Sequence, residues 1–224
     1  MSAVNDLQFA VPAAVDPAAP FPAAPYADAT AYFHQYGQEM ARALASVDPA
    51  AIEKAAAILA DAYLYGASVF SCGNGGSASI ANHLQCDHVK GVGTGTDLTP
   101  RVLSLCANVE ILTAIANDLS YEEIFTRQLQ SQARPGDVLV VISSSGRSAN
   151  IVNALTWARE HGLRTVALTG FAGGDARLMA EVAIHVDCAN YGVVEDAHQA
   201  IMHALAQYIR QSRMSADEVA ANVF

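Results

Sequence analysis

Short β-rich runs alternate with helix-like segments along most of this chain, and this alternation limits its fold more than any other feature. Helices are expected at 31–46 and 49–65, and strands at 68–71, 101–106, 137–142, 164–168 and 182–186. Further helices are expected at 77–90, 110–116, 121–132, 149–161, 176–180 and 193–210. Strands separated by helices pair in parallel, so the sequence predicts an α/β domain: a three-layer αβα sandwich around a five-stranded parallel sheet, with N-terminal helices.

The ends of the chain differ in composition from its middle. Residues 1–28 are rich in alanine and contain five prolines, which break helices, so we expect a flexible tail there or an arm that packs on a neighbouring subunit. The 224 residues are enough for one sizeable domain. We therefore expect a single domain over 29–212 and a C-terminal tail over 213–224.

Charge and cysteine content restrict the partners and the compartment. The formal net charge of -10 argues against a general nucleic-acid binder, because phosphate backbones favour basic surfaces. The N-terminus lacks the pattern of a secretory signal, and no apolar run is long enough to span a membrane. The four cysteines form no CxxC pair. These features predict a cytoplasmic protein that binds neither nucleic acid nor membrane.

Two polar loops directly follow predicted strands: GNGGSA at 73–78 and SSSGRS at 143–148. Glycines let a backbone approach a ligand closely, and a serine at the start of a helix lies where free amides favour an anion. Each loop alone fits an ordinary turn, but parallel strands end at the same sheet edge, so the loops should converge. They predict a phosphate pocket whose substrate-binding residues are Asn74, Gly75, Gly76, Ser77, Ser143, Ser144, Ser145 and Ser148.

Acids and histidines recur at helical spacing on two predicted helices. His83 and Asp87 are four residues apart and project from one face of the first. Glu195 and His203 are eight residues apart, about two turns, on the last. Together they fit a site for Zn²⁺ or another divalent cation. Taken singly, each is more simply a solvated charge or a hydrogen-bonded histidine.

In their order and spacing these motifs resemble the sugar isomerase (SIS) domain of the phosphoheptose isomerases. The likeness rests on GNGGSA followed by His83 and an acid four residues on, on SSSGRS, on AND at 116–118, on LTG at 168–170, and on the acids and histidines at 195–203. It extends from about residue 29 to residue 210. The resemblance implies the flavodoxin-like SIS fold and a homotetramer with sites at the subunit interfaces. The helices at 31–46 and 193–210 are candidates for that contact.

The resemblance also implies an activity and residue roles. It implies isomerisation of sedoheptulose 7-phosphate to D-glycero-D-manno-heptose 7-phosphate through an enediol, with Asp87 and His203 as the acid–base pair. Asp87 is expected to exchange the carbon-bound proton, and His203 the proton on oxygen. Asn117, Asp118 and Glu195 are implied substrate contacts. A metal, usually zinc, is implied at His83, Asp87, Glu195 and His203.

The sequence departs from the family pattern at two of these positions. Position 87 is generally Glu in the family, and its Asp is one methylene shorter; position 195 is commonly Gln, and its Glu adds a negative charge. Without a cation, we expect two opposed carboxylates to raise a pKa. Isomerisation of another phosphosugar therefore stays open, as does a non-catalytic SIS protein that binds a phosphosugar or acts as a scaffold.

Overall fold

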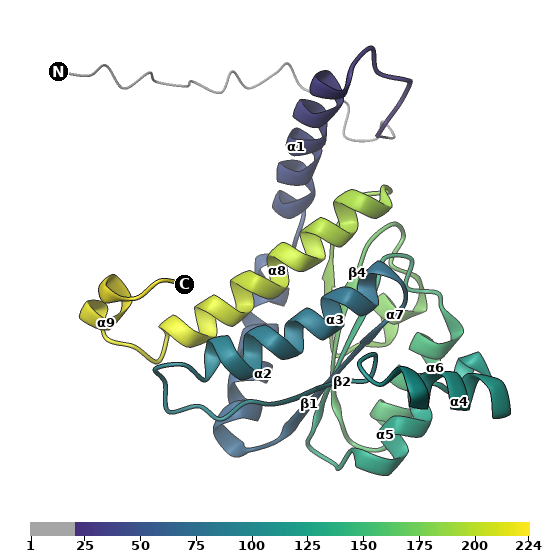
Figure 1. Cartoon of the computed structure of the whole chain (residues 1–224), viewed down its shortest axis with the longest axis vertical. Helices are drawn as coiled ribbons and strands as arrows, with labels where there is room; N and C mark the ends of the chain where they lie inside the picture. The colour runs from purple at the N-terminus through teal and green to yellow at the C-terminus, as the bar shows by residue number, and fades with distance from the viewer. Residues whose placement is uncertain (1–20) are drawn as a thin grey trace.

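The computed structural model describes residues 21–224 and contains one five-stranded parallel sheet in the order β2-β1-β3-β4-β5 (Figure 1). This confirms the predicted fold, and every strand lies within two residues of its expected limits. The strands are β1 (Ser68–Gly73), β2 (Arg101–Ser104), β3 (Val138–Ser143), β4 (Arg164–Thr169) and β5 (Val182–His185). The chain crosses from β1 to β2 on one side, then returns past β1 to β3. Ligands of such sheets bind at this reversal, beyond the carboxyl ends of the strands.

Helices cover both faces of the sheet. One face carries α2 (Pro49–Tyr65), α3 (Gly76–Cys86) and α8 (Tyr191–Gln211), and the other α5 (Thr126–Gln132), α6 (Ala149–Glu160) and α7 (Gly174–Met179) (Figure 1). Helix α1 (Ala29–Ala45) packs on α8 and projects beyond the sheet. The short α4 (Val109–Asp118) follows β2 along the chain, and α9 (Ala216–Ala221) is the last helix.

The central strand β3 is buried along its whole length, as its continuous apolar sequence indicates. Helix α2 has the limits expected from sequence because local signals define both of its ends. The Asp48 side chain accepts a hydrogen bond from the Ala50 amide at 2.9 Å, and Gly66 ends the helix with a φ of 73°. The limits of α2 and the burial of β3 thus follow from residues close together in the sequence.

Two expected helices were wrong in detail. The segment 77–90 ends as an α-helix at Cys86 and continues as a π-helix over Asp87–Val92, whose wider turn packs against α8. The segment 121–132 divides into a 3₁₀ turn, Tyr121–Glu123, and α5. Between them Ile124 and Phe125 are both buried in the core.

Both ends of the described chain pack on the domain. Most of the expected tail, residues 1–20, lies outside the described residues. Residues 21–28 form bends, and the Phe21 ring stacks on Tyr32 while its carbonyl accepts a hydrogen bond from Asn190 at 3.1 Å. At the other end α9 begins with a capping box, and the Phe224 ring lies against the Arg210 guanidinium. Within residues 21–224, no helix has the length and apolar character needed to cross a membrane.

Candidate functional site

The two polar loops meet at the carboxyl ends of β1 and β3, around a cavity of about 150 Å³. Two asparagines hold the loops together: the Asn74 and Asn150 carboxamides exchange two hydrogen bonds of 2.9 Å, and the Tyr121 hydroxyl donates to Asn74 at 2.9 Å. Asn74 therefore has much of its hydrogen-bonding capacity engaged within the protein. The cavity is lined by Asn74, Ser77, Ser143, Ser144, Ser145, Ser148, Tyr191 and Glu195. We call it the serine pocket.

The serine hydroxyls differ in what they contact. Ser143 Oγ accepts a hydrogen bond from the Gly146 amide at 3.1 Å, which fixes the second loop. Gly146 adopts a φ of 65°, and a Cβ at that position would overlap the Gly173 carbonyl. Ser144 is 5% exposed, and its Oγ is buried with no hydrogen-bond partner among the described residues. A buried hydroxyl without a hydrogen-bond partner costs folding free energy. The Ser144 hydroxyl is therefore a donor that a bound ligand could satisfy.

Glu195 brings a carboxylate into this pocket from α8. Its carboxylate lies against Gly76 in the first turn of α3, where any Cβ would collide with it. Burial raises the pKa of the Glu195 carboxyl, and the neighbouring charge of Asp196 raises it further. We expected a raised pKa from two opposed site carboxylates. The cause is different here: it is desolvation first and Asp196 second.

A second cluster lies farther along the same two helices. His83 Nε2 is 3.1 Å from Asp87 Oδ1, and His203 Nε2 is 3.3 Å from Asp87 Oδ2. The two Nε2 atoms are 3.5 Å apart. All three side chains are partly exposed, so a ligand can reach them. We call this group the His–Asp–His cluster.

The donor atoms of the cluster fit a divalent metal. A tetrahedral zinc with ligands at 2.0–2.1 Å separates its ligand atoms by about 3.3 Å. The contacts of 3.1 Å to Asp87 Oδ1, 3.3 Å to Asp87 Oδ2 and 3.5 Å between the two Nε2 atoms are close to that spacing, and three protein ligands would leave one position open. Glu195, expected as a fourth ligand, is not part of this arrangement. It lines the serine pocket instead.

Asn117 and Asp118, expected as substrate contacts, lie apart from both groups. Asn117 and Asp118 form the exposed last turn of α4, where the Asn117 amide donates to the Asp118 carboxylate at 2.8 Å. They line neither the serine pocket nor the cluster. Gly75 is the N-cap of α3, and its φ of 56° is a backbone conformation that glycine adopts readily.

The histidine at position 198 of α8 is fully buried. Burial lowers the pKa of His198 to about 4, so its side chain is neutral at physiological pH.

Three residues of the site were missed from sequence: Asn150, Tyr191 and Gln199. The Gln199 carboxamide lies 3.2 Å from His83 Nδ1 and 2.9 Å from His203 Nε2. Tyr191 precedes Glu195, and Gln199 precedes His203, by four residues on α8. Side chains so spaced share a helix face, so helical spacing was the available signal for both. Asn150 has no comparable signal.

Comparisons with known proteins cover most of the chain. The family model described as "SIS domain" matches residues 31–170. The phosphoheptose isomerase of Akkermansia muciniphila is 39% identical over 160 residues, which are 71% of this chain and 84% of that protein. The phosphoheptose isomerase of Mycobacterium tuberculosis is 38% identical over 154 residues, 67% of this chain and 76% of that protein.

Solved structures agree with these sequence matches. A phosphoheptose isomerase from Neisseria gonorrhoeae superposes with a TM-score of 0.74 at 29% identity, covering 81% of this chain and 96% of that one. One from Francisella tularensis gives the same TM-score and coverage at 28% identity.

Proposed function

This chain belongs to the phosphoheptose isomerase family of SIS-domain proteins, and on that premise we propose that it converts sedoheptulose 7-phosphate to D-glycero-D-manno-heptose 7-phosphate through an enediol. The enzyme is a phosphosugar isomerase of the aldose–ketose type. The observation that carries the proposal is the pairing of a serine-lined pocket with an acid–base cluster along two adjacent helices.

The spacing of the two groups supports a long sugar. Helices α3 and α8 lie side by side. On α3, Ser77 and His83 are six residues apart, or about 9 Å; on α8, Glu195 and His203 are eight apart, or about 12 Å. An open-chain heptose 7-phosphate spans about 10 Å from phosphorus to its first carbon, given bonds of about 1.5 Å. One substrate can therefore place its phosphate among the serines and its carbonyl end at the cluster.

We assign phosphate binding to the serine pocket. Its hydroxyls donate without a fixed positive charge, and the amides at the start of α3 add a favourable field. The unpartnered Ser144 hydroxyl supports this assignment, because a phosphate oxygen is the acceptor it lacks. Glu195 would accept hydrogen bonds from sugar hydroxyls near the phosphate. The proposed phosphate ligands are Ser77, Ser143, Ser144, Ser145 and Ser148, with backbone from 74–76.

We assign the proton transfers to Asp87 and His203. Asp87 moves the proton between the two carbons, and His203 moves the proton on the oxygens, which together interconvert ketose and aldose. The shorter Asp still reaches both imidazoles, at 3.1 and 3.3 Å. The cluster would hold zinc or a similar cation, which supplies Lewis-acid polarisation of the carbonyl oxygen. Asn117 and Asp118 remain proposed contacts for the middle of the sugar.

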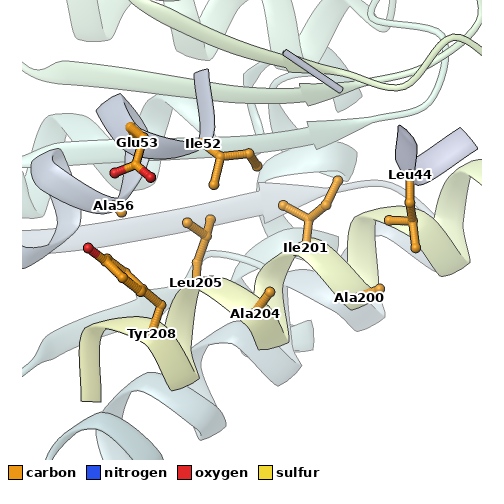
Figure 2. A pocket seen from close by; sticks show the side chains of 9 residues that line it. All are labelled: Leu44, Ile52, Glu53, Ala56, Ala200, Ile201, Ala204, Leu205 and Tyr208. Atoms are coloured by element: carbon orange, nitrogen blue, oxygen red, sulfur yellow. The ribbon is translucent and has the colours of Figure 1, made fainter. Parts of the chain in front are cut away.

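We also propose that the enzyme is a homotetramer. An apolar groove of about 480 Å³ lies between α1, α2 and α8 (Figure 2). Glu53 carries the only carboxylate in its lining, while Leu44 and Tyr208 are 38% and 49% exposed. A second copy of this chain would bury those side chains through the same helices. The apolar lining residues are Leu44, Ile52, Ala56, Ala200, Ile201, Ala204, Leu205 and Tyr208. A cytoplasmic location accords with the four free cysteines.

NMR-monitored turnover of sedoheptulose 7-phosphate tests the catalytic assignment. The native protein should produce the aldose phosphate, and Asp87→Asn and His203→Ala should each slow turnover by about 100-fold or more. Chelation followed by Zn²⁺ addition tests the metal. Full activity in Asp87→Asn would remove Asp87 from the proton-transfer role, and no turnover by the native protein would reject the enzyme proposal.

Light scattering tests the assembly separately. The native protein should have four times the mass of the 23.5 kDa chain. Ala204→Arg, which places a charge in the apolar groove, should lower that mass. A monomeric native protein would reject the proposed tetramer.

A further inference from the structure

Gln199 lies between the two imidazoles of the His–Asp–His cluster, and none of the roles assigned above uses it. Its carboxamide Nε2 is 3.2 Å from His83 Nδ1 and 2.9 Å from His203 Nε2. The side chain projects from α8 one turn before His203 and is half-buried. It is therefore fixed on the same helix face as the histidine that it contacts.

The two nitrogens of His83 face different neighbours. Its Nε2 points into the cluster, 3.1 Å from Asp87 and 3.5 Å from His203 Nε2. Its Nδ1 points away from the cluster, toward Gln199. A metal held by the cluster would therefore take the lone pair of Nε2. A neutral imidazole that gives Nε2 to a metal carries its proton on Nδ1, and that N–H needs an acceptor.

We infer that Gln199 is a positioning residue of the metal site, which accepts a hydrogen bond from His83 Nδ1–H and so holds His83 in its metal-binding tautomer. The inference rests on the metal binding included in the proposed function. A carboxamide offers either its oxygen or its NH₂ group after a half-turn about its last bond. As the structure stands, the NH₂ group can donate to both imidazoles. A half-turn would put the Gln199 oxygen where its nitrogen now lies, 3.2 Å from His83 Nδ1 and 2.9 Å from His203 Nε2, so that it can accept the hydrogen bond from His83 Nδ1–H.

Zinc affinity measured by chelator competition tests the inference, with unfolding curves to confirm that each variant folds. Gln199→Met keeps the length but has no comparable acceptor, and it should weaken zinc binding 10- to 100-fold, about the effect of losing such an outer partner. Gln199→Glu keeps an acceptor and should bind zinc within about threefold of native, or more tightly. Gln207→Met, two turns along α8 at an exposed position, is the matched control and should bind like native.

The tautomer itself is a second readout and does not need a variant. In the ¹⁵N-histidine-labelled, zinc-loaded native protein, His83 should carry its proton on Nδ1. A proton on Nε2, unchanged affinity in Gln199→Met, or equal losses in the Met and Glu variants would each overturn the inference. Native protein that binds no zinc would also overturn it, whereas turnover measured on the same sample shows separately whether the isomerase proposal stands.

Discussion

Replacing Ser144 with alanine should weaken substrate binding without weakening the fold. The Ser144 hydroxyl is buried at the edge of the serine pocket and has no hydrogen-bond partner among residues 21–224. If its partner is the substrate phosphate, the empty protein bears the desolvation cost of that hydroxyl. Removing it should leave the free energy of unfolding unchanged or raise it by about 1 kcal/mol.

The same substitution should lower the affinity for the substrate. A hydrogen bond to a charged group contributes about 1.5–3 kcal/mol, so Ser144→Ala should lose roughly 10- to 100-fold in affinity for the phosphosugar. Neighbouring Ser143 is equally buried, but its Oγ accepts from the Gly146 amide at 3.1 Å. Ser143→Ala should therefore also cost about 1 kcal/mol of stability. The two adjacent serines form a matched pair.

Two assays on the same samples separate these effects. Urea unfolding gives the stability of native, Ser144→Ala and Ser143→Ala proteins, and calorimetric titration with sedoheptulose 7-phosphate gives their affinities. The reasoning is refuted if Ser144→Ala loses more than about 1 kcal/mol of stability while its affinity for the phosphosugar stays unchanged. That result would mean that the hydroxyl serves the fold.

Three further predictions concern buried or crowded groups. Burial lowers the pKa of His198 from 6.5 in the unfolded chain to about 4 in the folded protein. As the pH falls from 6.5 to 4, the unfolded chain is protonated at His198 before the folded protein is, so the folded protein loses stability. Urea unfolding at pH 7 and pH 4.5 should show native protein losing up to about 3 kcal/mol relative to His198→Leu, and equal losses would contradict this. Glu195→Gln removes a carboxylate from the serine pocket and should tighten binding of inorganic phosphate by about 1 kcal/mol, roughly fivefold, in calorimetry at pH 8; weaker binding would contradict the placement of that carboxylate. Gly146→Ala forces a Cβ at positive φ onto the Gly173 carbonyl and should destabilise the protein by at least about 2 kcal/mol in thermal unfolding, whereas a neutral change would show that the loop is pliable.

The fold was predictable because its signals are local or periodic. Five apolar runs alternating with helical segments allow few arrangements other than a parallel sheet. Asp48, Pro49 and Gly66 define α2 by themselves, so its limits were correct to the residue. The GNGGSA and SSSGRS loops indicated the family, and the family-model match and the curated relatives confirm it.

The site was harder to predict because tertiary packing decides where side chains on one helix point. Helical spacing placed Glu195 and His203 on broadly one side of α8, yet Glu195 lies in the serine pocket and His203 in the cluster. The π-helix that begins at Asp87 also has no local signal, because it forms where the chain packs against α8. Gln199 was missed since glutamine at one position carries no distinctive chemistry until its neighbours are known.

The most direct test compares sedoheptulose 7-phosphate with unphosphorylated sedoheptulose, each incubated with native protein and followed by NMR. A serine pocket that holds phosphate while the His–Asp–His cluster moves protons predicts conversion of the phosphorylated ketose to its aldose. It predicts at least about 100-fold slower conversion of the unphosphorylated sugar, since the phosphate contacts are lost. Absence of turnover with the phosphosugar, or equal turnover of both sugars, would contradict the account.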